Sequence, residues 1–223
     1  VDRAIAGEPG QRGQVVFVAA AHNHGVDFDA VKTSGESRVE VYGRATGEET
    51  WRVHLTARLR VDGGEPGTPL DLHAVHARCT LPMSGTTYYE HLTGLGLEYR
   101  GSFCGVEQVW RGVGEALARL RLPDASCAPS DWGMHPALVD AGLQALFAAL
   151  PPSGEALGVK EPLVPFSFER VVWHRRGIAA GWCHVKILEG DVASGGAAVG
   201  DVAYYDERGA LLAECRGLCF VGM

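Results

Sequence analysis

The sequence predicts an α+β fold in which an antiparallel sheet curls around one central helix. Short apolar segments rich in Val and Leu alternate with Gly- and Pro-containing segments along most of the 223 residues, a pattern typical of a β-rich protein. One longer segment, Pro136–Leu150, is apolar around most of its circumference, so the rest of the protein must surround it. Because strand-like segments precede and follow it, a sheet wrapped around this helix is the arrangement that buries both.

Nine segments are expected to form strands, since each joins apolar and β-branched residues between turn-forming ones. In the clearest, Trp51–Val61, apolar side chains alternate with polar ones, which predicts a strand with one buried face. The expected strands are Gln14–Ala21, Ser37–Arg44, Trp51–Val61, Ser102–Arg111, Glu115–Leu122, Val164–His174, Ile178–Leu188, Ala197–Tyr205 and Ala210–Val221.

Two segments are expected to form helices. Thr86–Leu95 is short and amphipathic and ends before a glycine. In the longer one, Pro136 suits the first helical turn, and Pro151-Pro152 ends it. The Gly-, Pro- and charge-rich segment Val61–Pro69 predicts a linker between an N-terminal β part and a helix-plus-sheet part. Further loops are expected at Ser153–Glu161 and Glu189–Ala197.

Composition and charge are those of an ordinary globular protein. Hydrophobic residues make up 46% and charged residues 21%, and the formal net charge is −7, which argues against a nucleic-acid-binding surface because such surfaces are basic. No apolar run approaches the roughly 20 residues of a membrane span, and no signal peptide begins the chain. We therefore expect no nucleic-acid partner, no membrane and a cytoplasmic location. The chain does not begin with Met, and we expect it to be cut from a longer protein.

The cysteine and histidine spacings predict no metal site. The six cysteines are scattered, without a C-x-x-C pair or a Cys/His set at zinc spacing, as for thiols in a reducing compartment. His73 and His76 have the spacing of helical ligands, but no third ligand of a suitable type is close in sequence, so a loop or strand end is expected there.

Asp140 is the residue of the central helix that points most clearly to chemistry. An unpaired carboxylate among apolar neighbours is unfavourable, so Asp140 must find a partner or take up a proton. Gln144 follows one turn later, where its amide can reach the carboxyl, and Gly142 leaves space for a close approach by backbone or ligand. A carboxylic acid held this way suits a general acid. An Asp that only caps or braces the neighbouring loop is an equally good interpretation of the spacing.

The string His135–Leu146 resembles the H-P-A-L-x-D-x-x-x-Q motif of polyketide synthase dehydratase domains. Upstream, Tyr88–Leu92 followed by Gly96–Phe103 is similar to the family's Y-x-x-L and G-x-x-Y-G-P-x-F segment. Downstream, Leu163–Phe168 is similar to its L-P-F-x-W segment. The three motifs occur in the family's order, and the resemblance covers essentially the whole chain. Two further strings, Val39–Arg44 and Ala213–Leu218, also resemble family strands.

The resemblance implies a double hotdog, which is two antiparallel sheets that each wrap around a helix. Residues 1–69 would be the C-terminal part of the first hotdog plus a linker, and residues 70–223 would be the second hotdog, with its central helix at about 136–150. The first hotdog would thus be incomplete in this chain. The resemblance also implies neighbouring polyketide synthase domains as partners, and it allows a homodimer.

The resemblance further implies a substrate carried as a thioester on the phosphopantetheine arm of an acyl carrier protein, with no other cofactor and no metal. In the family, a histidine of the first hotdog removes the α-proton of a β-hydroxyacyl chain, and an aspartate of the second protonates the departing hydroxyl. Asp140 matches that acid and Gln144 its orienting partner. Tyr99 matches the tyrosine near the tunnel, and Gly142, Phe103 and Pro165 are expected to contact substrate.

The sequence departs from the family at two places. The family's histidine motif, H-x-x-x-G-x-x-x-x-P, does not occur, and the early cluster His22-Asn23-His24-Gly25 is expected to be a solvated loop. Arg100-Gly101 stands where the family has Gly-Pro, which frees the backbone and adds a charge near the tunnel. Two functions therefore stay open. One is dehydration by the intact domain, and the other is a dehydratase-like module with a branching, cyclising, double-bond-shifting or structural role.

Overall fold

The computed structural model describes residues 24–33, 36–45, 49–60, 67–122, 134–151, 162–175, 180–190 and 197–222. The chain divides into two compact units, Val1–Glu65 and Pro66–Met223. The expected strand Gln14–Ala21 and the expected loop Ser153–Glu161 lie outside the described residues, as does most of the expected linker.

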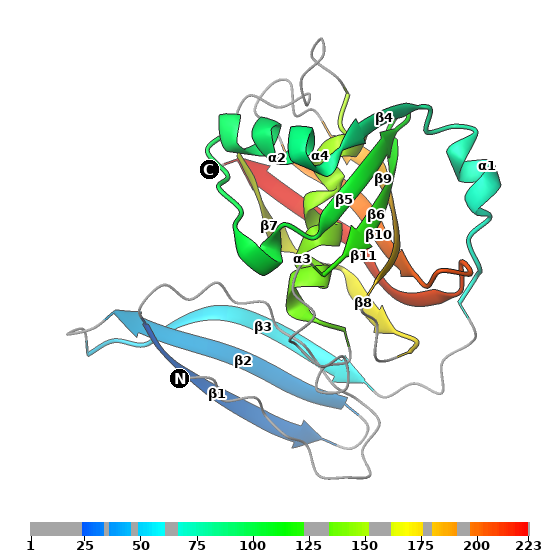
Figure 1. Cartoon of the computed structure of the whole chain (residues 1–223). Helices are drawn as coiled ribbons and strands as arrows, with labels where there is room; N and C mark the ends of the chain where they lie inside the picture. The colour runs from blue at the N-terminus through cyan, green and yellow to red at the C-terminus, as the bar shows by residue number, and fades with distance from the viewer. Residues whose placement is uncertain are drawn as a thin grey trace. The chain divides into compact units, whose positions relative to one another are not determined.

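The first unit contains an antiparallel sheet of three strands in the order β1 (His24–Thr33), β2 (Glu36–Ala45) and β3 (Arg52–Arg60) (Figure 1). The alternation predicted for β3 holds from Leu55 onward, where apolar side chains are half-buried and polar ones exposed. It fails before that point, because the pairing of β3 with β2 slips by one residue at His54. Such a bulge moves the preceding side chains to the other face of the strand, and Trp51 and Val53 are accordingly exposed.

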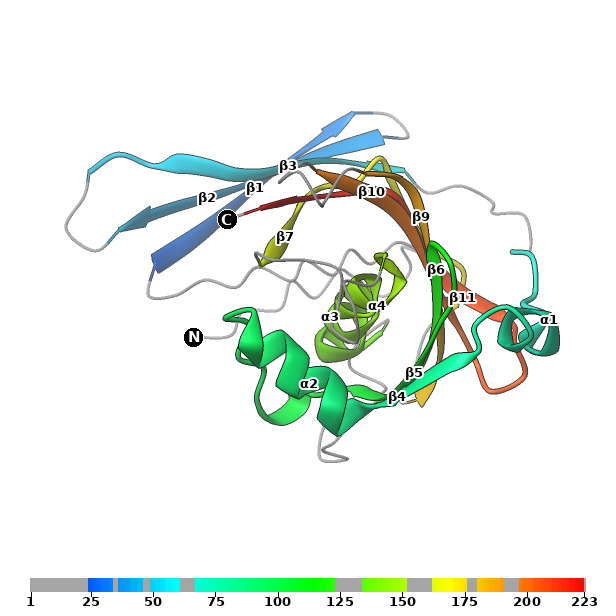
Figure 2. The same cartoon turned by 90° about the horizontal axis from the view of Figure 1, so that it is seen from above.

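The second unit is an antiparallel sheet that curves around two consecutive helices, α3 (Pro136–Gln144) and α4 (Leu146–Ala149) (Figure 2). The strands follow the order β4-β5-β6-β9-β10-β11-β7, and β8 also pairs with β11. This confirms the predicted sheet around a buried central helix. The strands are β4 (Leu81–Ser84), β5 (Val106–Arg111), β6 (Glu115–Arg121), β7 (Leu163–Ser167), β8 (Arg170–Trp173), β9 (Ala180–Gly190), β10 (Ala198–Tyr205) and β11 (Leu211–Gly222).

The central helix is not continuous to Leu150 as expected but breaks at Ala145. There the Ala148 N–H donates to the Ala145 carbonyl at 3.1 Å, a tighter turn than the α-helical one. The Gln144 carbonyl, which would accept that N–H in a continuous α-helix, instead accepts the Tyr88 hydroxyl at 2.5 Å. Apart from Asp140, every side chain from position 137 to 150 is buried.

Two helices precede the central one, α1 (Leu72–His76) and α2 (Gly85–Gly94). The interpretation of the first segment as a loop or strand end was wrong, because Asp71 caps a helix there by accepting the Ala74 N–H at 2.9 Å. His76 packs edge-on against Trp110 at 4.7 Å between ring centroids. Strand β4 was not anticipated, and the expected strand Val164–His174 is divided into β7 and β8.

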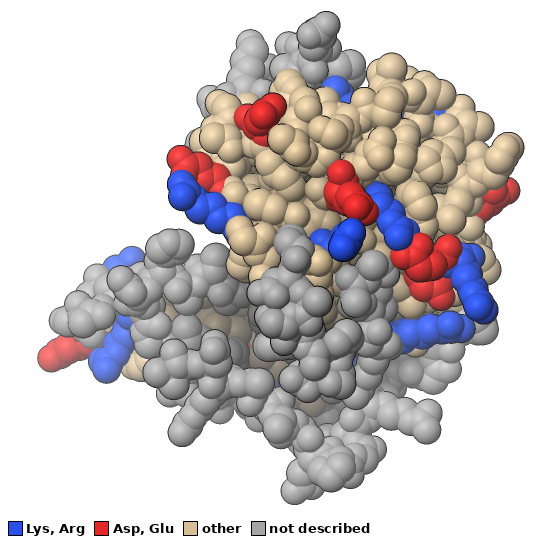
Figure 3. Space-filling view, viewed as in Figure 1, with Lys and Arg blue, Asp and Glu red and all other residues tan. Residues whose placement is uncertain are grey.

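Within the described ranges, no group of three or more His, Cys, Asp or Glu side chains is placed to hold a metal ion, and no helix has the length and apolarity of a membrane span. On the face drawn in Figure 3, acidic and basic side chains are interspersed, and the described ones form no broad patch of one sign.

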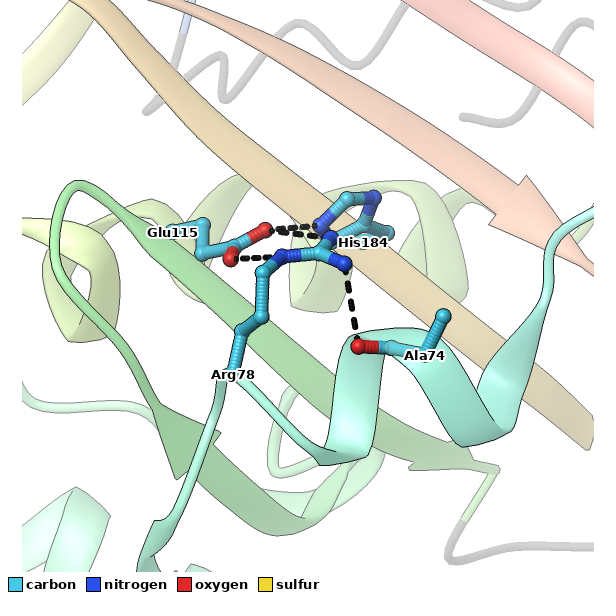
Figure 4. Close-up of polar contacts among 4 residues, drawn as sticks. All are labelled: Ala74, Arg78, Glu115 and His184. Atoms are coloured by element: carbon cyan, nitrogen blue, oxygen red, sulfur yellow. Dashed lines mark hydrogen bonds and ion pairs between the residues drawn. The ribbon is translucent and has the colours of Figure 1, made fainter.

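An ion cluster fastens α1 to the outside of the sheet (Figure 4). Arg78 donates twice to the Glu115 carboxylate, at 2.6 and 3.1 Å, and once to the Ala74 carbonyl at 2.9 Å. His184 of the neighbouring strand lies 3.0 Å from the same carboxylate. These hydrogen bonds, the Arg78 bond first, hold the pKa of Glu115 below its ordinary value. Glu115 is therefore a charged anchor for α1.

We expect Glu115→Gln to lower the free energy of unfolding by about 1–2 kcal/mol at pH 7, since charge-assisted hydrogen bonds are lost. The folded-state pKa of Glu115 is depressed, so its stabilisation is present above the ordinary pKa and is lost as pH falls through the folded-state pKa. We therefore expect the free energy of unfolding, measured with urea, to fall less between pH 7 and pH 4 in the variant than in the native chain.

The matched control is Glu207→Gln, which removes an exposed carboxylate that receives two 2.6 Å bonds from Arg119. Surface pairs of this kind contribute about 0–1 kcal/mol. An effect of Glu115→Gln no larger than the control's would show that the cluster does not fasten α1.

Candidate active site

Asp140 lies in the middle of α3, half-buried between the buried Val139 and Ala141. Its Oδ2 accepts a hydrogen bond of 2.6 Å from Nε2 of Gln144, one helical turn later. Burial raises the pKa of the Asp140 carboxyl above its ordinary value, although the bond from Gln144 acts in the opposite direction. Asp140 thus keeps its proton to higher pH than an exposed aspartate does.

The amide of Gln144 is fully hydrogen-bonded. Besides Asp140, its Nε2 donates to the Phe103 carbonyl at 3.0 Å, and its Oε1 accepts the Tyr89 hydroxyl at 2.9 Å. The Tyr89 oxygen in turn accepts the backbone N–H of Val106 at 2.9 Å. The Gln144 side chain is 2% exposed, so each bond replaces water that the amide has lost.

This network determines which oxygen of Asp140 can carry the proton. Because a Gln144 N–H points at Oδ2, a proton of the neutral acid belongs on Oδ1. No described residue forms a hydrogen bond to Oδ1. Oδ1 is therefore the atom from which Asp140 can donate a proton to a bound molecule.

Tyr99 and Phe103, two of the residues expected to contact substrate, both belong to the surroundings of Asp140. The Tyr99 ring lies 6.1 Å from that of Tyr89, and burial, followed by the nearby charge of Asp140, raises the pKa of Tyr99 to about 12. Phe103 contributes its backbone carbonyl to the Gln144 amide, while its side chain is 43% exposed. Contact of these side chains with substrate stays a prediction.

Gly142 allows the close approach of a side chain, and its expected contact with substrate stays a prediction. A Cβ atom there would lie 2.2 Å from Cε1 of Tyr204, whose hydroxyl donates to the Val139 carbonyl at 2.6 Å. The glycine thus admits a tyrosine ring against α3, which is a packing role. Pro165 is exposed on β7, opposite Phe220 of β11. Neither Pro165 nor Gly142 takes part in the described hydrogen bonds that link Asp140, Gln144 and Tyr89.

The departure at Arg100-Gly101 does not bring a positive charge to Asp140. The Arg100 side chain is 84% exposed and pairs with Glu98 at 2.7 Å. Gly101 adopts φ +58°, a left-handed conformation that proline cannot take. Gly101 begins the 3₁₀ turn η1 (Gly101–Phe103). The last residue of this turn, Phe103, accepts a hydrogen bond from the Gln144 amide at its carbonyl.

Sequence reasoning quoted Tyr88 and Tyr89 only as part of a motif and gave them no role. Both form hydrogen bonds to Gln144. The Tyr88 hydroxyl donates to the Gln144 backbone carbonyl, and the Tyr89 hydroxyl donates to the Gln144 side-chain oxygen. A signal was available, since a tyrosine hydroxyl usually has a hydrogen-bond partner where the ring is buried. Of the early histidines, His22 lies outside the described residues and His24 begins β1.

Comparisons with known proteins agree with the family resemblance of the sequence motifs. The family model of the polyketide synthase dehydratase N-terminal domain matches residues 67–221. Mycoketide-CoA synthase of Mycobacterium tuberculosis is 32% identical over 155 residues, which are 70% of this chain and 4% of that protein. Polyketide synthase GfsE of Streptomyces halstedii is 30% identical over 201 residues, 85% of this chain and 5% of that protein. The chain spans only a small part of these relatives.

Solved dehydratase domains share the fold. The dehydratase domain of the CurK module of curacin polyketide synthase superposes with a TM-score of 0.75 at 26% identity, covering 89% of this chain and 67% of that one. A dehydratase domain of a trans-AT polyketide synthase from Brevibacillus brevis superposes with a TM-score of 0.78 at 26% identity. The match covers 89% of this chain and 69% of that one. The expected hotdog fold is thereby confirmed, and the chain belongs to the polyketide synthase dehydratase family.

Proposed function

We propose that this chain provides the acid half of a site that eliminates water from a β-hydroxyacyl thioester. The observation that carries the proposal is Asp140, a half-buried carboxyl with a raised pKa whose Oδ2 is occupied by Gln144 and whose Oδ1 has no described partner. A positioned acid of this kind is what a departing hydroxyl needs, since hydroxide itself is a poor leaving group.

In the proposed reaction, Asp140 donates its Oδ1 proton to the β-hydroxyl of the substrate. The bond between that oxygen and the β-carbon breaks, and water leaves with the bonding electrons. A base removes the α-proton, and its C–H electrons form the α,β double bond. The Asp140 carboxylate that remains is stabilised by the Gln144 N–H on Oδ2. Proton exchange with solvent restores both groups.

The base is proposed to be a histidine of a first hotdog, as in the family, because the 223 residues contain no H-x-x-x-G-x-x-x-x-P string. The substrate would arrive on the phosphopantetheine arm of an acyl carrier protein in the cytoplasm, next to the neighbouring domains of the synthase. The proposal needs no further cofactor.

A second candidate is a dehydratase-like module that does not dehydrate but branches, cyclises, shifts double bonds or has a structural role. The missing histidine string and the Arg100-Gly101 substitution favour it. The pairing of Arg100 with Glu98 weakens the second of these arguments, because the added charge is solvent-exposed and is neutralised by a neighbouring carboxylate.

The two candidates are separated by assaying the 223-residue chain alone and within the longest reading frame that encodes it. Each protein is incubated with a β-hydroxyacyl carrier protein, and the loss of water is followed by mass spectrometry. We expect no turnover by the chain alone, because loss of a positioned base costs about 10²–10⁴-fold in rate. Turnover by the longer protein would support dehydration, and its absence in both would favour the non-dehydrating module.

Turnover by the chain alone would show that the base is within it. His22→Ala and His24→Ala variants then identify the base. Turnover that survives both changes would exclude the two early histidines, and turnover that either change abolishes would assign the base to that histidine.

A further inference from the structure

Helix α2 holds Gln144 at two points. The Tyr88 hydroxyl donates to the Gln144 backbone carbonyl at 2.5 Å, and the Tyr89 hydroxyl donates to its side-chain Oε1 at 2.9 Å. Tyr88 is fully buried and Tyr89 half-buried. The first contact fixes the helix at the break after Gln144, and the second fixes the amide itself.

The direction of the Tyr89 hydrogen bond follows from its other partner. The Val106 N–H donates to the Tyr89 oxygen at 2.9 Å, and a backbone N–H can only donate. The hydroxyl hydrogen is then free to be donated. Its nearer acceptor is Gln144 Oε1 at 2.9 Å, and the Phe103 carbonyl lies farther away at 3.3 Å. Donation to Gln144 requires Oε1 on that side and Nε2 toward Asp140. Two hydrogen bonds therefore set the orientation of the amide, one from Nε2 to the Phe103 carbonyl and one from Tyr89, which is itself held by the backbone of β5.

A reversed amide would present Oε1 to Asp140. Two oxygens would then face each other unless the carboxyl proton lay between them. That proton would be held by Gln144 and withdrawn from a substrate hydroxyl. It would also turn Oε1 toward the Phe103 carbonyl oxygen, a second acceptor, in place of the 3.0 Å hydrogen bond from Nε2. Without a donor at Oε1, the Phe103 carbonyl alone opposes this reversal, so the Gln144 N–H is held less firmly on Oδ2.

We propose that Tyr89 is a positioning residue for the acid. By donating to Gln144 Oε1, it holds the Gln144 N–H on Oδ2 of Asp140 and leaves Oδ1 to carry the transferable proton. The effect of Tyr89 on catalysis rests on the proposed dehydration. The hydrogen-bond relay from Val106 through Tyr89 to Gln144 and Asp140 does not.

The first test measures the pKa of Asp140 directly, by ¹³C NMR titration of carboxyl-labelled aspartate in the 223-residue chain, with Asp140→Asn to assign the signal. Tyr89→Phe removes one oxygen atom. We expect it to raise the pKa of Asp140 by about one unit, because the hydrogen bond that favours the carboxylate is weakened. The Gln144 side-chain N–H signals should also exchange faster with solvent. An unchanged pKa in a folded variant would overturn the proposal.

Tyr88→Phe is the matched control, since it removes the neighbouring buried hydroxyl that binds only backbone. We expect it to lower the melting temperature without moving the pKa of Asp140. If Tyr89→Phe fails to fold, 3-fluorotyrosine at position 89 keeps the ring and strengthens the donor. It should lower the pKa of Asp140, and a pKa that stays constant would again refute the relay.

The second test uses dehydration by whichever protein proves active. Tyr89→Phe should lower kcat about tenfold with KM within about twofold, and should move the loss of activity at high pH upward. In a Gln144→Ala background, Tyr89→Phe should have no further effect. Additive losses would show that Tyr89 acts elsewhere. If no protein dehydrates, the proposed function fails while the NMR result still decides the role of Tyr89.

Discussion

Asp140→Asn is expected to reduce dehydration by about 10²–10⁴-fold, the usual contribution of a positioned general acid. The asparagine side chain keeps the shape of the carboxyl and can still accept the Gln144 N–H on its oxygen. It has no proton acidic enough to release to a departing hydroxyl. The loss should therefore appear in kcat, with KM little changed, and it is measured as the rate of water loss from a β-hydroxyacyl carrier protein.

The same variant should be more stable than the native chain at neutral pH. The folded-state pKa of Asp140 is raised by burial, so its contribution to stability is fully present below the unfolded-state pKa and is lost as pH rises through the folded-state pKa. Asn is neutral throughout and avoids that loss. Melting temperatures of the two proteins should differ at pH 7 and converge at pH 3.

Glu90→Gln provides the control for Asp140→Asn. Glu90 is an exposed carboxylate on α2, and its neutralisation should leave the dehydration rate within about twofold and the melting temperature nearly unchanged. Full activity in a folded Asp140→Asn protein would contradict the assignment of Asp140 as the acid. Lost activity with equal stability at all pH values would contradict its burial.

The central helix could be predicted from sequence because its pattern leaves few alternatives. A segment that is apolar on nearly every side has to be buried, and Pro136 and Pro151 mark its limits. The pairing of Asp140 with Gln144 was equally accessible, since residues four apart on a helix are neighbours. Both predictions depend on spacing within one element, which the sequence contains.

What could not be predicted depends on contacts between elements. The slip at His54 that exposes Val53 depends on how β3 pairs with β2, and the break at Ala145 goes with a hydroxyl from α2. The role of Tyr89 requires Val106 and Gln144, 17 and 55 residues further along the chain, to meet at one oxygen. The periodicity of a sequence contains no information about contacts between distant segments. The orientation of the Gln144 amide could therefore be determined only from the fold.

Gly142→Ala is the substitution in which fold and site are most directly linked. The added methyl group would lie 2.2 Å from Cε1 and 2.6 Å from the hydroxyl oxygen of Tyr204, well inside van der Waals contact. The ring is 2% exposed and bonded to the Val139 carbonyl, so it cannot move without loss of packing. We expect the free energy of unfolding to fall by about 3 kcal/mol, the upper part of the range for overpacked cores.

Activity should fall as well, because relief of the clash displaces the turn of α3 that bears Asp140. A misplaced acid loses rate steeply with distance, so kcat should drop even at temperatures where the variant is folded. Urea unfolding and water-loss assays on the same preparation measure the two effects.

Gly94→Ala is the matched control, since a Cβ atom at the end of α2 would meet nothing within 4 Å. There the change should leave stability equal or higher by about 0.5–1 kcal/mol, because alanine loses less conformational freedom in a helix than glycine. A Gly142→Ala protein as stable as this control would mean that Tyr204 does not fill the space beside α3.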